Sequence, residues 1–242
     1  MTILLIAALL PAALLMVYIY QKDKVEKEPI KLLSNLFLFG GLTIVTACIA
    51  ELLLSMILGI VFSKGTLPYM AIENFLIVAL SEELGKYIVL KKKTWHSPHF
   101  NYTFDAVVYA VAVSLGFAAF ENVIYVLSGT LGTAVMRGLL SVPGHAIDGV
   151  FMGCYYGIAR KCRGYGDEEG AKKNLIKAIV IPVLTHGFYD FCIDISSNAG
   201  IFFLVFMAFE VVVTFVAIKT VKKLSLEDEP LDYYSPDDNM MM

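Results

Sequence analysis

Two adjacent glutamates and a lysine stand inside a run of residues that is otherwise apolar enough to cross a membrane. The run extends over Phe75–Leu90 and contains Glu82, Glu83 and Lys86. Charged side chains at membrane depth cost a few kcal/mol each, so a chain that keeps them there pairs them or uses them. Glu82 and Lys86 are four residues apart, so they share a helix face and can pair. Glu83 points about 100° away on a helix, so we expect one of the two acids to be less well compensated.

Polar side chains of catalytic type recur in three later apolar runs. They are Glu121 with Asn122, His145 with Asp148, and His186 with Asp190. A helix rises about 1.5 Å per residue, so the depth of each side chain can be estimated from the outer end of its run. Glu82, His145 and His186 fall in one layer. Glu121 and Asp190 fall in a second layer nearer the outer surface, so these five side chains can converge. Asp190 shares a helix face with His186 and can orient its ring.

Such a site has a simple chemistry. A buried glutamate can act as general base on a water molecule, and a histidine can stabilise the oxyanion that forms on an attacked carbonyl. The structural alternative is that Glu82 and Lys86 only neutralise each other and that the histidines only pack. In that view His145 and Asp148 stabilise a helix broken at Pro143.

Three further charged residues in apolar runs have simpler interpretations. We interpret Glu51 and Glu73 as structural or interfacial, and we expect Arg137 to extend its side chain to the nearby outer interface.

The composition indicates a membrane protein. Hydrophobic residues make up 58% of the chain and charged residues 17%, whereas soluble domains average about 45–50% apolar and about 25% charged residues. No basic tract with interleaved aromatic residues indicates a nucleic-acid partner. The four cysteines include no closely spaced pair, so neither a disulfide framework nor a zinc knuckle is indicated.

The apolar runs predict an all-α polytopic bundle of seven transmembrane helices around a polar intramembrane site. We place the helices at about 2–20, 32–62, 68–90, 104–127, 134–159, 175–195 and 201–218. The fifth region contains Pro143-Gly144 near its middle. It is either one broken helix or a short outer helix followed by a second that begins near His145, which would make eight. Glycines recur every four residues in its second half and provide a smooth face for close packing, at Gly149, Gly153 and Gly157.

Every basic cluster falls on the same side of this arrangement. By the positive-inside rule that side is cytoplasmic, which places the N-terminus outside and the C-terminus in the cytoplasm. We predict a single transmembrane domain over residues 1–223, with a motif-bearing core at about 70–195. Residues 224–242 form an acidic tail that we expect to be disordered and cytoplasmic.

Known signatures of intramembrane proteases narrow the choice of protease class for this chain. The chain has no His-Glu-x-x-His of zinc proteases and no Gly-x-Ser-Gly of rhomboid type. Gly164-Tyr165-Gly166-Asp167 matches a motif of the presenilin class, and Tyr189-Asp190 matches its partner motif. The first lies in a hydrophilic loop and the two occur in reverse order, so we interpret the match as coincidence.

Four motifs in order resemble those of the PrsW family of bacterial intramembrane proteases. They are Glu82-Glu83-x-x-Lys86, Phe117-x-x-x-Glu121-Asn122, a lone His145, and His186-x-x-x-Asp190. The resemblance covers residues 70–195. That family is distantly similar to the CAAX prenyl proteases, which carry histidine where Glu121 stands and commonly asparagine where Asp190 stands. These departures favour the PrsW branch.

The resemblance implies a glutamate-dependent endopeptidase of the bacterial cell membrane that needs no cofactor. The implied catalytic residues are Glu82, Glu83, Glu121, His145, His186 and Asp190, supported by Lys86, Asn122 and Asp148. Glu82, aided by Glu83, would be the base, and His186 and His145 would position the water or hold the oxyanion. In PrsW the substrate is a membrane-anchored anti-sigma factor. It is cut first on its outer side, which begins the release of an extracytoplasmic-function sigma factor. The partners implied are that protein and the lipid bilayer.

Three alternatives stay open at this point. The same protease could hold Zn²⁺ on His145, His186 and Glu82, since two histidines and a glutamate are a known catalytic zinc set. A transporter or channel could use the buried acids and imidazoles to relay protons, although no inverted repeat is evident. A non-catalytic membrane scaffold would use them for stability alone.

Overall fold

The computed structural model describes residues 2–196 and 200–231, and every named element within them is a helix. The elements are α1 (Thr2–Lys22), α2 (Ile30–Val61), α3 (Leu67–Ile72), the π-helix η1 (Glu73–Ala79), α4 (Leu80–Thr94), α5 (Asp105–Ser128), α6 (Leu131–Leu139), α7 (Ser141–Gly164), α8 (Glu168–Ser196) and α9 (Ile201–Leu226). The predicted all-α class is confirmed.

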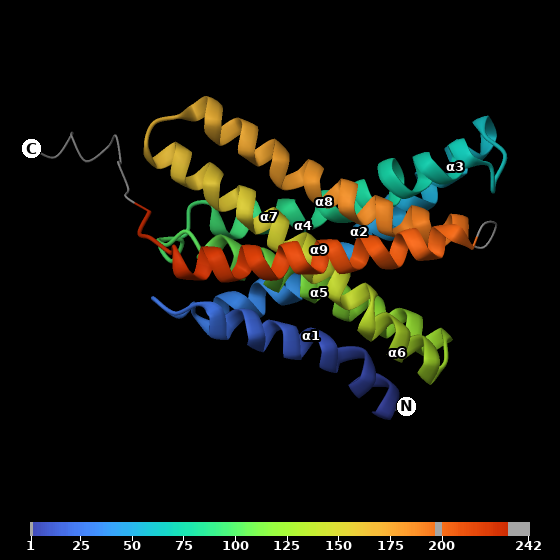
Figure 1. Ribbon diagram of the computed structural model, residues 1–242, viewed down its shortest axis with the longest axis horizontal. Helices are drawn as coiled ribbons and strands as arrows, with labels where there is room; N and C mark the ends of the chain where they lie inside the picture. Colours follow the sequence, from blue (N-terminus) through green and yellow to red (C-terminus); the bar gives the residue numbers. More distant parts are fainter. Residues whose placement is uncertain (1, 197–199, 232–242) are drawn as a thin grey trace, which may run out of the picture.

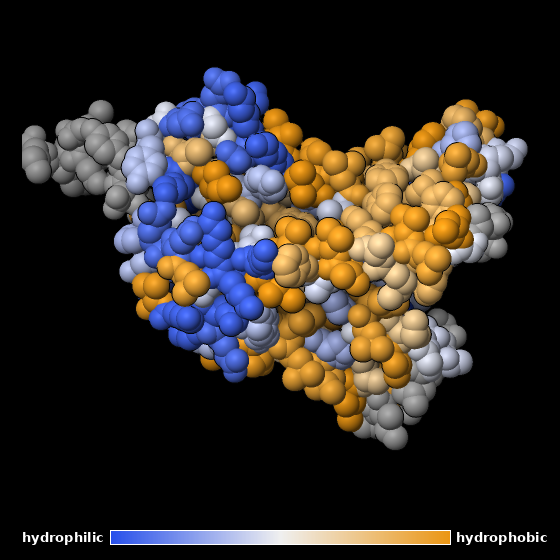
Figure 2. Space-filling model, viewed as in Figure 1, coloured by the Kyte–Doolittle hydropathy of each residue, from blue (hydrophilic) through white to orange (hydrophobic). Residues whose placement is uncertain are grey.

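Five of these helices are long and apolar enough to cross a membrane: Leu4–Lys22, Ile30–Val61, Asp105–Leu127, Glu168–Ser196 and Ile201–Leu226. Figure 2 shows hydrophilic residues gathered at one end of the molecule and apolar residues over most of the remainder. We call this hydrophilic end the basic end, because α4, α7 and α9 carry lysine or arginine in their last turns there. The chain is thus a helical membrane protein, and the count of seven or eight spans stays a prediction.

Helix α5 occupies the centre of the bundle. Every residue from Asp105 to Ala119 is buried, and α5 packs against α1, α2, α4, α6 and α7. In Figure 1 it lies in the middle, behind α9, with α1 along one edge and α8 along the other. A helix enclosed on all sides is apolar around its whole circumference, which is the pattern of its sequence.

The glycine face of α7 packs closely, as predicted, and the structure shows that its partner is α5. A Cβ atom on Gly153 would stand 2.5 Å from Val107 Cα and 2.6 Å from Ala106 O. Gly149 and Gly157 face the same partner segment. Small residues at such an interface let two backbones approach closely. The contact fixes α7, which carries His145, against α5, which carries Glu121.

The break in the fifth predicted region lies earlier than expected. Helix α6 ends at Leu139 and α7 begins at Ser141, so the region does form two helices. The second helix begins at Ser141 and not near His145, so Pro143 lies in its first turn. Proline is tolerated there, since the N–H that it lacks has no partner within the helix.

Part of the predicted tail is packed against the bundle. Its predicted start at residue 224 lies inside α9, which ends at Leu226. Beyond the helix, Phe104 N donates to Asp228 Oδ1 at 2.8 Å and Leu231 N donates to Asn101 O at 2.7 Å. The chain up to Leu231 is therefore held at the start of α5. The remainder of the predicted tail, 232–242, lies outside the described residues.

Candidate active site

The two glutamates lie in the first turn of α4, directly after the π-helical segment η1. Single π turns inside helices are frequent at functional sites. Lys86 is fully buried one turn later, with Nζ 2.6 Å from Glu83 Oε1 and 3.4 Å from Glu82 Oε2. Glu83 is therefore the more closely paired acid, and Glu82 is the less compensated of the two. Residues three apart on a helix are neighbours just as residues four apart are, so one lysine reaches both.

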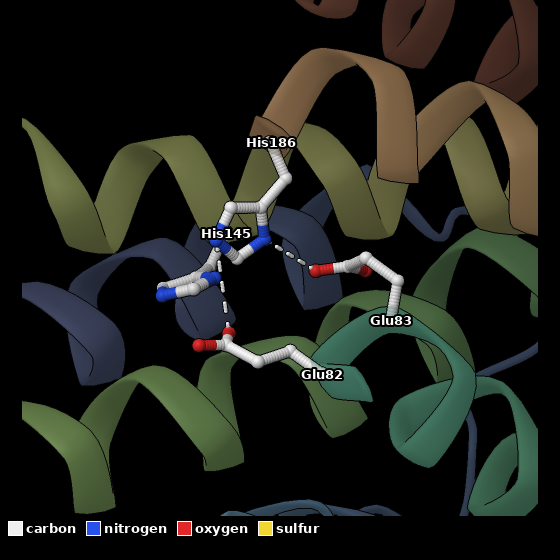
Figure 3. Close-up of side chains that lie close together, drawn as sticks. All are labelled: Glu82, Glu83, His145 and His186. Carbon is white, nitrogen blue, oxygen red and sulfur yellow. Dashed lines mark hydrogen bonds and ion pairs between the residues drawn. The ribbon is translucent and has the colours of Figure 1, made fainter. Parts of the chain in front are cut away.

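His186 joins α8 to these acids. Its Nδ1 lies 2.8 Å from Glu83 Oε1, and its Nε2 lies 3.2 Å from Asp190 Oδ2 and 3.8 Å from Glu82 Oε2. Dashed lines in Figure 3 join this ring to both glutamates. Ionised carboxylates only accept hydrogen bonds, so a ring held between them is placed to donate from both nitrogens, as an imidazolium does. The predicted pairing of His186 with Asp190 is present.

His145 approaches the same cluster from α7. Its Nε2 lies 2.9 Å from Glu121 Oε2 and its Nδ1 lies 3.1 Å from Lys86 Nζ. An ammonium group has no lone pair, so Nδ1 accepts from Lys86 and the ring proton sits on Nε2, where it is donated to Glu121. The ring also packs edge-on to Phe117 and His186, at centroid distances of 5.5 and 5.1 Å. His145 is thus held as a neutral imidazole.

The predicted supporting aspartate joins the cluster, but the asparagine does not. Asp148 accepts from Thr185 Oγ1 at 2.6 Å, and its other oxygen lies 3.8 Å from His186 Nδ1. Asn122 instead donates to Ala8 O at 2.8 Å and so holds α5 to α1. It follows Glu121 by one residue, which turns it about 100° around the helix.

Arg137 belongs to the site, contrary to our expectation that it extends to the interface. Its Nη2 lies 2.7 Å from Glu121 Oε2 and 2.9 Å from Ser141 Oγ. The guanidinium carbon lies 3.8 Å from the centre of the Tyr125 ring. The depth estimate that places Glu121 near the outer surface places Arg137 there too. That shared depth is the signal in the sequence that could have identified the pair.

A cavity of about 730 Å³ borders the cluster. Five of the predicted catalytic side chains line it: Glu82, Glu121, His145, His186 and Asp190. Glu83 and Lys86 are fully buried and are not among the described residues of its wall. The wall extends to Arg137 on α6 and to Ser196 at the end of α8, and Figure 2 shows the molecule hollowed between α6 and α9. A peptide and water can therefore reach Glu82 from the end opposite the basic end.

The same cluster fits a metal ion by donor type and spacing. One donor atom from each of Glu82, Glu83, His145 and His186 lies within 4.8 Å of the others. Imidazole and carboxylate donors are those that Zn²⁺ takes at catalytic sites. Lys86 Nζ lies among these donors, so an ion bound there requires the ammonium group to withdraw.

Comparisons with known proteins identify the family of the chain. The family described as "PrsW family intramembrane metalloprotease" matches residues 28–218. The chain is 33% identical to Protease PrsW of Oceanobacillus iheyensis over 91% of this chain and 95% of that protein. It is 33% identical to Protease PrsW of Geobacillus kaustophilus, over 84% of this chain and 85% of the relative, and 31% identical to that of Bacillus subtilis, over 84% and 88%. No solved structure matches. On this evidence the chain belongs to the PrsW family of intramembrane proteases.

Proposed function

We propose that this peptidase cleaves a membrane-anchored anti-sigma factor with a water molecule that Glu82 activates. The difference between the two adjacent glutamates supports this assignment. Glu82 lines the cavity and has only longer contacts, at 3.4 Å to Lys86 and 3.8 Å to His186. Glu83 is fully buried and held at 2.6 and 2.8 Å by the same two residues. The acid that lines the cavity and is loosely held is the better base, and the fixed one is a positioning residue.

In this mechanism Glu82 removes a proton from water as the water oxygen attacks the carbonyl carbon of the peptide bond. His186 stabilises the negative charge that develops on the carbonyl oxygen. The proton on Glu82 then passes to the amide nitrogen as the C–N bond breaks, which leaves a carboxylic acid and an amine. Glu83 and Asp190 hold His186 in position throughout.

The proposed orientation follows from the positive-inside rule, under which the basic end is cytoplasmic. The N-terminus is then outside and the C-terminus in the cytoplasm. The cavity faces the outer side, where the resemblance to the PrsW family implies the first cut in an anti-sigma factor. That cut would begin the release of an extracytoplasmic-function sigma factor.

A zinc-dependent form is the second candidate, and the donor set together with the family description favours it. Glu82, His145 and His186 would hold the ion, and the His186 nitrogen that does not bind it would keep its own carboxylate partner, Glu83 on Nδ1 or Asp190 on Nε2. When bound, Zn²⁺ supplies Lewis-acid polarisation and a more acidic water molecule.

The test co-expresses a tagged candidate anti-sigma factor in membranes with the wild type, Glu82→Gln, Glu83→Gln or His186→Ala, and follows substrate size. We expect Glu82→Gln to lower cleavage about 10²–10⁴-fold, the usual contribution of a general base. His186→Ala should lower it about 10²–10³-fold, the usual loss when a group that stabilises the oxyanion is removed. Glu73→Gln is the matched control, because Glu73 pairs with Tyr69 and is not among the described residues of the cavity wall.

Undiminished cleavage by Glu82→Gln at normal membrane levels would contradict the proposed base. Cleavage that a chelator abolishes and added Zn²⁺ restores would favour the zinc form, and cleavage that a chelator leaves unchanged would favour the metal-free mechanism.

A further inference from the structure

Glu210 is an isolated acid in an apolar helix. It is the single charged residue between Ile201 and Ile218. It is nine-tenths buried, it lines the cavity, and it makes no hydrogen bond or ion pair with any described residue. Ionisable residues inside a membrane span mark functional sites by default, because keeping them there without a partner is unfavourable.

The cavity wall beside Glu210 is aromatic. Phe203, Phe206 and Phe209 of α9 line the cavity together with Tyr189 of α8. The Tyr189 and Phe206 rings meet edge to face, with centroids 5.0 Å apart. Aromatic faces attract cations, and long basic side chains lay their apolar stems along such surfaces while the charged head reaches a polar group. A carboxylate within an aromatic wall therefore suits a lysine or arginine side chain.

The remaining charges of the cavity favour the same occupant. Its described acids besides Glu210 are Glu51, Glu82, Glu121, Asp148, Asp190 and Asp194. Among the described residues of the wall, Arg137 is the only lysine or arginine, and it is paired with Glu121. A cleft lined mainly by one sign of charge concentrates groups of the opposite sign.

We propose that Glu210 and its aromatic wall form a subsite for a lysine or arginine side chain of the substrate. The proposal rests on the proposed function and names a feature of the substrate, a basic residue in the segment that enters the cavity. Glu210 is nine residues from the outer end of α9 and His186 is ten from the outer end of α8, depths of roughly 14 and 15 Å. The basic residue would thus lie at the level of the scissile bond.

The test uses the purified full-length protein in lipid nanodiscs. The probes are labelled single-span peptides that are identical except for Lys, Gln or Glu at one position, which is moved along the outer half of the span. Binding and cleavage are measured in parallel. We expect the wild type to bind the best Lys peptide roughly tenfold or more tightly than its Gln counterpart, as a desolvated charge pair allows.

Variants separate the contribution of the Glu210 carboxylate to the Lys preference from that of the aromatic wall. Glu210→Gln should remove the preference for Lys and leave the affinity for the Gln peptide unchanged, and Glu210→Lys should reverse the preference toward Glu. Phe206→Leu keeps the carboxylate and should weaken the Lys preference through loss of the ring. Glu73→Gln removes an acid that is not among the described residues of the cavity wall, so this variant should keep the full preference for Lys.

Equal binding of Lys and Gln peptides by the wild type would overturn the subsite, as would a Lys preference that survives Glu210→Gln. Discrimination in binding without cleavage of any peptide would support the subsite and contradict the proposed function. Cleavage without any difference in binding between the Lys and Gln peptides would support the proposed function and contradict the subsite.

Discussion

Lys86 contacts Glu82, Glu83 and His145 from a fully buried position. It also lies over the Phe117 ring, 4.2 Å from the centroid. One ammonium group therefore balances two acids and determines which nitrogen of His145 carries the proton. Such a residue is a positioning residue for the site, because it lies behind the groups that line the cavity.

Replacing Lys86 tests this role. Removing one partner from a buried charge network leaves the others uncompensated, which typically costs about 3–5 kcal/mol. We expect Lys86→Met to lower the unfolding free energy by this order and to reduce cleavage, as measured by denaturant unfolding in detergent. Lys92→Met, an exposed lysine on the same helix, is the control. A Lys86→Met protein as stable as the wild type would show that the acids do not need its charge.

Among the elements, the contact between α5 and α7 determines how Glu121 meets His145. It depends on the glycine face of α7, where the backbone of α5 occupies the space that a side chain would need. Backbone atoms cannot move aside as the end of a flexible side chain can. The site is therefore sensitive to changes at an interface that is remote from the catalytic groups.

We expect Gly153→Val to destabilise the protein by about 1–3 kcal/mol, the usual penalty for overpacking. Cleavage should fall in parallel, because His145 moves away from Glu121. Gly59→Val introduces the same residue into α2, where the nearest atom to a Cβ is 3.9 Å away, and should be close to wild type in both assays. Equal stability of the two variants would contradict this account of the interface.

At the scale of the whole molecule, three segments meet around acids that are buried or partly buried at the basic end. They are the connection between α1 and α2, the start of α5, and the chain after α9, which bring together Asp23, Glu28, Asp105 and Asp228. Tyr109 donates to Glu28 at 2.6 Å. Burial raises the pKa of Asp23 to about 6 and that of Glu28 to about 7.

These shifts predict the direction of a pH dependence. The folded protein binds these protons more tightly than the unfolded chain, so their stabilisation is complete below the ordinary pKa values of 3.8 and 4.5. It is lost as the pH rises through about 6 to 7. We expect the melting temperature to fall between about pH 4 and pH 7, and Glu28→Gln to flatten that fall. Glu169→Gln, at an exposed acid, should leave the slope unchanged; an unchanged slope in Glu28→Gln would contradict the assignment.

The sequence alone was sufficient for the class of the protein and for most of its chemistry. Long apolar runs determine membrane helices, because an unpaired backbone in lipid is too unfavourable for other structures. Polar groups such as Glu82, His145 and His186 stand out in those runs, and spacing within one helix predicted the pairs of Lys86 with Glu82 and of Asp190 with His186. Helix ends were less predictable, as the break at Leu140 shows, because they depend on packing with neighbours.

Only the tertiary structure decided which groups meet across helices. It placed Glu82 on the cavity and Glu83 behind it, paired Arg137 with Glu121, turned Asn122 toward α1, and left Glu210 in an aromatic wall. These outcomes depend on the rotation of each helix about its axis and on how closely its neighbours approach. Both are set by contacts between residues far apart in the chain, whereas sequence spacing determines angles only within a single helix.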